Sequence, residues 1–177
     1  MPLTVPAELS FEQAIALTQA LLVRLSQNQL TDAETESYIA ALVNSETGAR
    51  GFFVTYLTGE ASPADRPTDA VIQALRTSPE IVSELLVKNL AMSTAMAIAH
   101  YRQRHLSMAE GSERVRSRTM GLLQRLQLPL INQKLQSLRE TARTGEGDYQ
   151  SFLSRWGYDA EQQEAIATTI TSLLGFL

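Results

Sequence analysis

The sequence predicts an all-α fold, an irregular multi-helix bundle of about eight helices around a long central helix near residues 79–108. Three observations support this fold class. Apolar side chains recur at every third or fourth position, which is the period of a helix that buries one face. Polar capping residues repeatedly stand just ahead of such runs, as they do at helix starts. Only one short segment, residues 52–56, favours a strand by its composition.

Length and composition are those of a folded globular chain. The 177 residues are 44% hydrophobic and 19% charged, which predicts a single domain over residues 1–177 rather than a disordered segment. The chain has no cysteine, which excludes disulfide frameworks, iron–sulfur clusters and thiol nucleophiles. Its first residues lack the basic segment and apolar run of a secretory signal. We therefore expect a soluble, cytoplasmic protein.

Capping boxes predict the first two helices. In this pattern a serine or threonine side chain accepts a hydrogen bond from a backbone N–H three residues on, and the residue there returns one. The first helix is expected to run to about Asn28 and the second to about Asn44. The two pairs are Ser10 with Gln13 and Thr31 with Glu34.

The segment 48–59 is the most ambiguous one. Its residues 52–56 favour a strand by propensity, but four of its apolar and aromatic residues share one helical face. A lone strand would leave its backbone donors and acceptors unpaired. We therefore predict a short helix that ends at Gly59, followed by an internal linker over residues 59–68 with two prolines; residues 1–9 form an N-terminal tail.

The central helix has the strongest start signal. After a short helix capped by Thr68 and ending near Arg76, Ser78-Pro79-Glu80 places a serine at the cap, a proline where no backbone donor is needed and an acid at the positive helix end. The helix is expected to reach about Met108, a length of about 45 Å.

The remaining helix boundaries follow from glycine, proline and capping residues. A break is expected at Gly111-Ser112, with Ser112 as a cap, and an interruption at Leu128-Pro129, after which the helix resumes to Arg143. The last two predicted helices are one capped by Asp148 and ended by Gly157, and one opened by Asp159 with Gln162.

The stretch 81–99 is nearly continuous in apolar and small residues. Glu84, Lys88 and Asn89 fall inside it, and a charge near a bilayer centre costs about 2.5–3.5 kcal/mol on insertion scales. We therefore expect a helix buried by its neighbours and no membrane span.

Motifs for metal, phosphate and nucleophilic chemistry are missing from the sequence. His100 and His105 are five residues apart, about 140° around a helix, and neither follows a glutamate at the spacing of a carboxylate-bridged metal site. Gly48 and Gly51 do not precede the lysine of a phosphate-binding loop, and no serine stands in a nucleophile elbow. We expect no metal, no cofactor and no recognisable catalytic residue, and nothing in the sequence favours an enzyme.

Charge is distributed unevenly along the chain. Residues 1–98 carry a net charge of −6, residues 99–143 of +6 and residues 144–177 of −4. Eight of the nine basic residues in the middle stretch are arginines, which hold carboxylates and phosphates through two parallel hydrogen bonds.

Five of these arginines form the candidate partner-binding surface. Three of them project within about 40° of one another on a helix, and two stand at the end of the preceding helix. They are Arg114, Arg118 and Arg125, and Arg102 and Arg104. Three interpretations remain open: the arginines face the protein's own acidic helices, they bind an acidic protein or small anion, or they bind nucleic acid. The last is the least favoured, because the net charge is negative.

Two further surfaces are weaker candidates. Met92 and Met96 among alanines indicate close helix packing, but an apolar-ligand pocket beside the central helix is an alternative, with Asn89, His100 and Tyr101 as its polar groups. The final apolar residues are expected either to pack onto the protein or to form the seam of a homodimer: Leu173, Leu174, Phe176 and Leu177.

The leading functional hypothesis is a non-catalytic helical interaction or regulatory module that binds another protein with an acidic surface. The alternatives are a binder of a small or hydrophobic ligand, or an enzyme with an unrecognised site. Nucleic-acid binding is less favoured.

Overall fold

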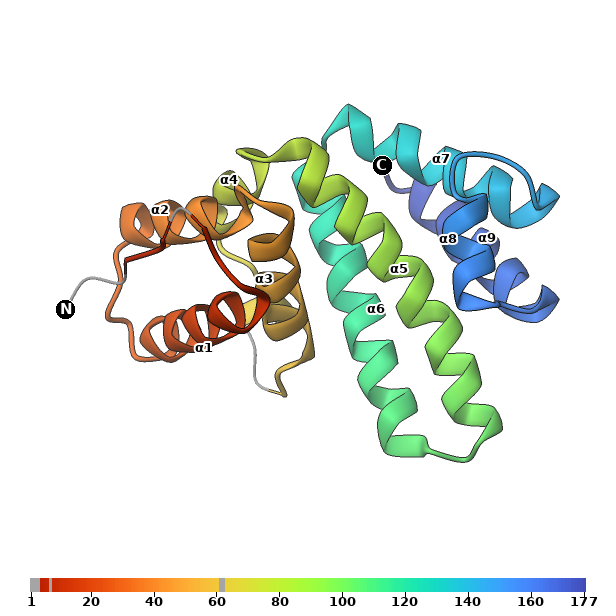
Figure 1. Ribbon diagram of the computed structural model, residues 1–177, viewed down its shortest axis with the longest axis horizontal. Coiled ribbons are helices and arrows are strands. Elements are labelled where there is room, and N and C mark those ends of the chain that lie inside the picture. The colour runs from red at the N-terminus through yellow and green to blue at the C-terminus, as the bar shows by residue number, and fades with distance from the viewer. Residues whose placement is uncertain (1–3, 7, 61–62) are drawn as a thin grey trace. The chain divides into compact units, whose positions relative to one another are not determined.

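The protein is all-α, as the sequence predicts. The computed structural model describes residues 4–6, 8–60 and 63–177, and within these ranges the chain forms nine α-helices and one short 3₁₀ helix, with no strand (Figure 1). The chain divides into two compact units, the first ending at Leu85 and the second spanning Leu86–Leu177. Each unit is described by itself below; the single domain over residues 1–177 stays a prediction.

The first unit holds four helices and the 3₁₀ turn, followed by the start of a fifth helix. These are α1 (Phe11–Ser26), α2 (Asp32–Val43), α3 (Glu46–Thr58), η1 (Pro63–Asp65), α4 (Asp69–Arg76) and the first turns of α5 (Pro79–Arg102). The two predicted capping boxes are confirmed, at the starts of α1 and α2. Side-chain oxygens of Ser45 and Thr68 cap α3 and α4 by accepting from the N–H groups of Gly48 and Val71, without the return bond of a capping box.

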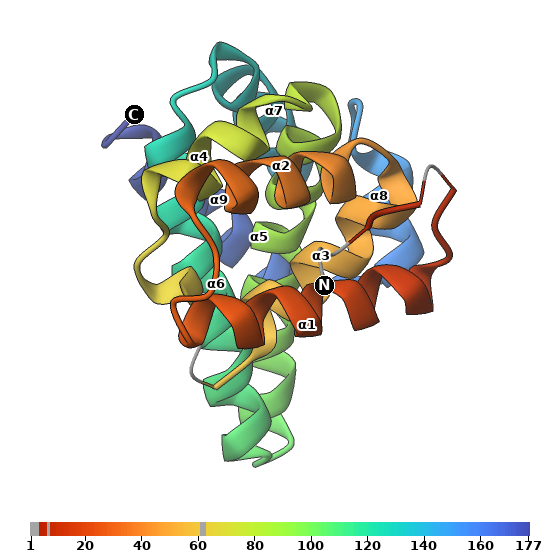
Figure 2. The same ribbon diagram turned by 90° about the vertical axis from the view of Figure 1, so that its left-hand side faces the viewer.

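Helix α3 confirms the predicted helix in the ambiguous segment. Its aromatic residues Phe52, Phe53 and Tyr56 are buried, and the rings of Phe52 and Tyr56 stack with their centroids 5.0 Å apart. Helix α3 packs against both α1 and α2 (Figure 2), and α2 packs against α4. Tertiary burial of these rings therefore outweighs their preference for strands.

A glycine allows α1 and α3 to approach closely. A Cβ atom at Gly51 would lie 2.4 Å from the Cβ of Ala14 and 3.1 Å from the backbone nitrogen of Ile15. Any side chain at this position would therefore push the two helices apart.

The predicted linker and tail lie partly outside the described residues. Gly59 ends α3, and the 3₁₀ helix Pro63–Asp65 falls within the predicted linker 59–68, of which residues 61–62 are not described. Of the predicted tail, residues 4–6, 8 and 9 form no helix, and residues 1–3 and 7 are outside the description.

The second unit consists of the remainder of α5 and four further helices. These are α6 (Leu106–Leu126), α7 (Pro129–Thr144), α8 (Gln150–Trp156) and α9 (Ala160–Leu174). Helix α7 packs against α8 and α9, and α6, α7 and α9 all contribute buried leucines or isoleucines to the unit's core. The Nε2 atom of Gln162 donates a buried hydrogen bond of 3.0 Å to the Ala95 carbonyl, which ties α9 to α5.

The predicted central helix 79–108 is too long. Helix α5 ends at Arg102, residues 103–105 form a turn, and α6 begins at Leu106, so that the two helices make a hairpin (Figures 1 and 2). The turn consists of three polar residues, which have no apolar group to bury and so gain little from continuing the helix.

The predicted break at Gly111-Ser112 is also wrong, because both residues lie inside α6. A Cβ atom at Gly111 would meet no described atom within 4 Å, so this glycine marks neither a turn nor a close approach. A single glycine lowers helix propensity by about 1 kcal/mol, which the packing of the long α6 outweighs.

Other predicted boundaries have mixed outcomes. Pro129 stands at the start of α7, Gly157 ends α8 and Asp159 caps α9, as predicted. The expected cap at Asp148 is wrong: Tyr149 holds the capping position, and the Asp148 carboxylate instead accepts a hydrogen bond of 2.9 Å from Ser137 Oγ on α7.

Among the described residues, α5 is the one helix long and apolar enough to cross a membrane by length and composition. Its most apolar 18-residue window has a mean hydropathy of 1.4, and 56% of that window is buried inside the protein. The core helix of a soluble protein has the same properties.

Candidate functional site

The turn between α5 and α6 has an unusual backbone. The His105 N–H donates to the His100 carbonyl (2.9 Å) and the Arg104 N–H donates to the Tyr101 carbonyl (3.0 Å), which is the hydrogen-bond pattern of a Schellman motif. The residue between the helices in this motif must adopt a left-handed conformation, and Arg104 does so, with φ of 60°. For a residue with a Cβ atom this conformation costs roughly 1–2 kcal/mol, and glycine is the usual choice.

The start of α6 lacks the caps that begin the helices of the first unit. His105 holds the capping position, but within the described chain its side chain makes no capping hydrogen bond, and the first turn of α6 has no acidic residue. The backbone N–H groups of that turn therefore carry the positive end of the helix dipole without a side-chain cap or a first-turn acid among the described residues.

Three large apolar side chains surround this turn. Tyr101, Leu106 and Met108 are 49%, 60% and 56% exposed. Leu106 and Met108 lie about 160° apart around the start of α6, so they project to different sides of the hairpin end. Together with the exposed Arg104, these three residues are called the tip below.

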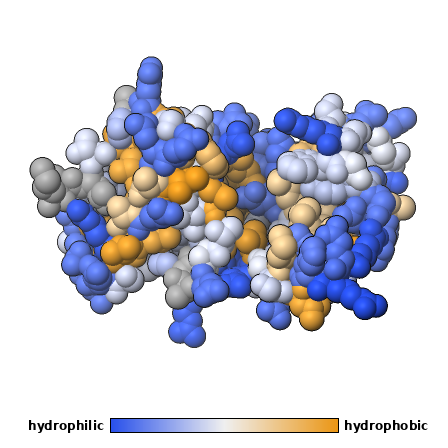
Figure 3. All heavy atoms as spheres, turned by 60° about the horizontal axis from the view of Figure 1, so that its bottom comes forward, coloured by the Kyte–Doolittle hydropathy of each residue, from blue (hydrophilic) through white to orange (hydrophobic). Residues whose placement is uncertain are grey.

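The tip lies at the end of the hairpin that is remote from α7 (Figure 1). Figure 3 shows the molecule turned so that this end comes forward, and in this view hydrophobic atoms reach the surface among hydrophilic ones. Single exposed apolar residues are common in soluble proteins, but three around one arginine form a feature that a partner would cover.

The guanidinium of Arg104 has no electrostatic partner among the described residues. In the part of the chain that the structure describes, its guanidinium makes no ion pair or side-chain hydrogen bond. The tip therefore combines an uncompensated positive charge, an uncapped helix start and exposed apolar surface.

Arg102, two residues earlier, is in a different situation. Its guanidinium binds Asp159 at 2.5 Å (Nη1–Oδ2) and also binds Glu161, both at the start of α9. The hydrogen bond from Arg102, together with the backbone N–H of Gln162, lowers the pKa of Asp159, and the two carboxylates raise the pKa of Arg102. Arg102 thus joins α5 to α9, as in the interpretation that an arginine faces the protein's own acidic residues.

The other predicted arginines do not gather at the tip. Arg114 is half-buried on α6, and Arg118 is buried, with 4% of its surface exposed. Arg125 is exposed in the last turn of α6, about 30 Å along the helix from the turn that holds Arg104. The structure therefore does not bring the five arginines together on one exposed surface.

The predicted polar groups of a ligand pocket are also separated. Asn89 and His100 are half-buried on α5, about 16 Å apart along the helix, and Tyr101 is exposed at the tip. The Nδ1 atom of His100 is buried without a hydrogen-bond partner among the described residues, and its ring centroid lies 6.4 Å from that of His105. None of the three lines the hollow found at the other end of α6, and the described residues include no group of three side chains that could hold a metal ion.

Sequence reasoning missed Leu106 and Met108 as surface residues because it placed both inside the central helix. The available signal was the polar run Gln103-Arg-His105, which interrupts the apolar pattern between Tyr101 and Leu106. The left-handed conformation of Arg104 had no signal, because arginine rarely adopts it.

Comparison with known proteins identifies the chain's family. Residues 10–173 match the family described as "Uncharacterised conserved protein UCP020893", and the chain belongs to that family. No curated protein and no solved structure matches the chain. The matched range includes the whole tip.

Proposed function

We propose that this member of the family is a non-catalytic helical interaction module, and that its tip binds an acidic surface of a partner protein. The observation that supports this most directly is Arg104, a charged residue held in a left-handed conformation at an exposed turn. Strained backbone that a glycine would relieve is concentrated at functional positions, because selection retains the side chain despite its conformational cost.

The electrostatics of the tip favour a negatively charged partner group. Arg104 and the uncapped first turn of α6 present positive potential at the same end of the hairpin, and neither is neutralised by the described side chains. A carboxylate would bind the guanidinium through two hydrogen bonds or accept one from an N–H group of that turn. Elsewhere at this end of α5, Arg102 already has the carboxylates of Asp159 and Glu161.

The apolar residues determine the shape of the partner surface. Because Leu106 and Met108 project to different sides, a flat surface would cover only one of them. A shallow concave surface with acidic residues at its base and apolar walls would cover both. Aromatic, methionine and arginine side chains are enriched in the buried centres of protein interfaces, and the tip contains one of each.

Capture experiments with charge-matched variants test this proposal. The wild-type chain, Arg104→Glu and Arg155→Glu are immobilised, and proteins retained from nuclease-treated lysate of the native organism are quantified by mass spectrometry. Both variants replace one arginine with one glutamate, so they have the same net charge. Arg155 is exposed on α8 and lies outside the tip, which makes it the control. We expect one acidic protein to be retained by the wild type and Arg155→Glu, and to be depleted at least about tenfold, or 1.4 kcal/mol, with Arg104→Glu.

A second variant pair separates apolar from electrostatic contributions. Leu106→Ser combined with Met108→Ser removes the apolar side chains of the tip, and Trp156→Ser removes an exposed apolar side chain on α8 as a control. Only the tip variant should release the partner, with circular dichroism and melting unchanged in both. Equal retention by Arg104→Glu and Arg155→Glu, or a partner that depends on nucleic acid, would contradict the proposal.

A further inference from the structure

The Schellman motif at the end of α5 brings together the only two histidines of the chain. In this motif the residue whose N–H closes the turn and the residue whose carbonyl accepts from it commonly carry apolar side chains that contact each other. Here the two positions are held by His105 and His100, and their ring centroids lie 6.4 Å apart. Two imidazole rings therefore occupy the place of the usual apolar pair.

The pairing depends on the turn. If one helix continued through residues 100–105, the two histidines would point about 140° apart. Because α5 ends at Arg102, the chain folds back and His105 returns to the neighbourhood of His100. The expectation of no metal site assumed the continuous helix, and so it does not apply to this pair.

The separation of the two rings suits a metal ion held between them. An imidazole nitrogen lies about 1.2 Å from its ring centroid and about 2.0–2.1 Å from a bound zinc ion. Two rings that share one ion therefore have centroids about 6.5 Å apart at opposite positions and about 5.3 Å apart at a tetrahedral angle. The observed 6.4 Å lies within this range, and the exposed side chain of His105 can reach the shorter distance by a change of its dihedral angles.

His100 provides a nitrogen that lacks a partner. Its Nδ1 atom is buried and makes no hydrogen bond among the described residues. Such an atom destabilises the folded state unless a water molecule or an ion binds it. A metal ion between the rings would satisfy this nitrogen.

We propose that His100, through Nδ1, and His105 bind one divalent transition-metal ion, with water in its other coordination positions. Imidazole nitrogen suits Cu²⁺, Ni²⁺ and Zn²⁺, and Cu²⁺ binds most tightly to a given set of such ligands, whereas Mg²⁺ and Ca²⁺ require oxygen ligands. This site does not depend on the proposed partner of the tip.

The surroundings of the pair determine the affinity. The described residues include no group of three histidine, aspartate or glutamate side chains, so the ion has two protein ligands rather than the four of a structural zinc site. The exposed Arg104, between the two histidines in sequence, repels a cation, whereas the charge of Arg102 is neutralised by its two carboxylate partners. Binding is therefore expected to be micromolar rather than nanomolar.

Titration of the untagged chain with Cu²⁺ alone, followed by electron paramagnetic resonance at neutral pH, tests the site. The wild type should bind one ion with the superhyperfine pattern of two imidazole nitrogens. His105→Gln changes an exposed side chain, so circular dichroism should show native helix content. This variant should show a dissociation constant at least about tenfold higher, because one ligand is lost.

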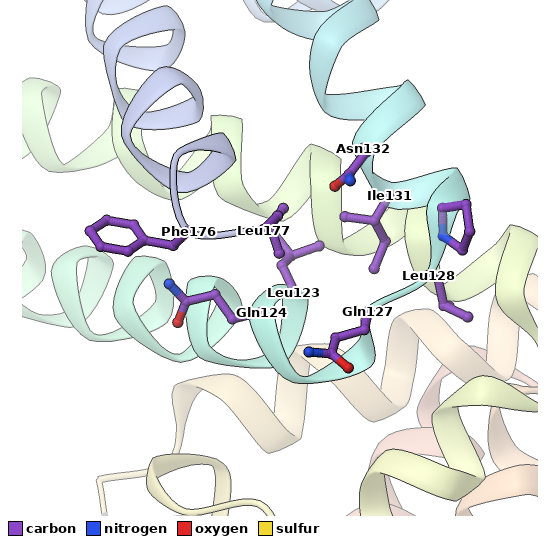
Figure 4. A pocket seen from close by; sticks show the side chains of 9 residues that line it. Leu123, Gln124, Gln127, Leu128, Ile131, Asn132, Phe176 and Leu177 are labelled. Carbon is purple, nitrogen blue, oxygen red and sulfur yellow. The ribbon is translucent and has the colours of Figure 1, made fainter.

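A variant with a relocated histidine is the matched control. His105→Gln combined with Gln124→His keeps two histidines, but places the second one about 28 Å along α6 from position 105. Gln124 lies at the other end of α6, beside a hollow of about 230 Å³ between α6, α7 and the residues that follow α9 (Figure 4). This control should bind Cu²⁺ as weakly as His105→Gln does.

Zn²⁺ provides a second readout through thermal stability. An ion that binds the folded state raises the melting temperature, so Zn²⁺ should stabilise the wild type and Mg²⁺ should not. His105→Cys should keep the Zn²⁺ effect, because a thiolate is also a zinc ligand, whereas His105→Gln should lose it. Equal Cu²⁺ affinity in the wild type and the relocated-histidine control, or a wild type whose melting temperature Zn²⁺ leaves unchanged, would overturn the proposal.

Discussion

The helix starts of the first unit and the start of α6 are built on opposite principles. In α1, α2, α3 and α4 a serine or threonine oxygen accepts from a backbone N–H group three residues on, at 3.1–3.4 Å. At α6 a histidine holds that position without a capping bond from its side chain within the described chain, and an arginine precedes it in a left-handed conformation. The first unit neutralises its own helix ends, whereas the tip leaves its positive end and its apolar side chains exposed.

Under the proposed function, this difference separates residues that stabilise the fold from residues that bind a partner. Caps contribute about 1 kcal/mol each, so their absence at α6 and the strain at Arg104 both lower the stability of the second unit. A partner that neutralises the tip would offset these costs in the complex. Three pairs of substitutions test the comparison, in order of decreasing effect on stability.

The largest effect on stability is expected at the close approach of α1 and α3. Gly51→Ala places a Cβ atom 2.4 Å from that of Ala14, so α1 and α3 must move apart. Overpacking of this kind costs about 1–3 kcal/mol, more than the gain in helix propensity from alanine. Urea unfolding followed by circular dichroism should show this loss.

Gly111→Ala in α6 is the matched control for that experiment. Its Cβ would meet no described atom within 4 Å, so only the propensity gain of about 0.5–1 kcal/mol remains, and the protein should become more stable. A loss of stability in both variants would show that the close approach at Gly51 is not the cause.

The second substitution relieves the strain at the tip. Arg104→Gly should raise the free energy of unfolding by about 1 kcal/mol, because glycine adopts the left-handed conformation without a Cβ clash. The same variant should lose the partner captured by the wild type, so stability and binding change in opposite directions.

Gly157→Ala provides the inverse of this change. Gly157 ends α8 with φ of 63°, and its Cβ position is unobstructed by any described atom, so alanine introduces conformational strain alone. It should lose about 1 kcal/mol and keep the partner. If Arg104→Gly proved less stable than the wild type, the strain argument for the tip would fail.

Local signals account for what the sequence predicted correctly. The boxes at Ser10 and Thr31 and the cap at Asp159 depend on residues within one turn, and all three appear in the structure. The break predicted at Gly111 is wrong because glycine occurs both inside helices and in turns, and the sequence around it does not distinguish the two.

Features of the candidate sites that depend on distant segments could not be predicted. Arg102 binds Asp159 and Glu161, which lie 57 and 59 positions further along the chain. These two carboxylates neutralise the charge of Arg102 within the protein. The hollow requires α6, α7 and the residues after α9 together. Periodicity within one helix contains no information about such contacts.

The smallest effect concerns two carboxylates whose pKa values are lowered for different reasons. Hydrogen bonds from the Thr31 backbone and side chain lower the pKa of Glu34, whereas the guanidinium of Arg102 is the main cause for Asp159. A carboxylate with a lowered pKa stabilises the folded state above its ordinary pKa, near 3.8 for aspartate and 4.5 for glutamate, and this contribution is lost as the pH falls through the folded-state pKa. Wild-type melting temperatures should therefore decrease below about pH 4, and less steeply in Asp159→Asn and Glu34→Gln, which keep the caps.

Salt distinguishes the two carboxylates. The exposed pair of Arg102 and Asp159 is screened by added salt, whereas the hydrogen bonds from Thr31 to Glu34 act at contact distance and are screened less. In molar sodium chloride the melting temperature of Asp159→Asn at neutral pH should approach that of the wild type, while the deficit of Glu34→Gln should remain. If Arg102→Gln lowered the melting temperature as much in Asp159→Asn as in the wild type, the ion pair would not be the source of the Asp159 effect. In that case the ion pair with Asp159 would not distinguish Arg102, as a stabilising residue, from Arg104 two positions away.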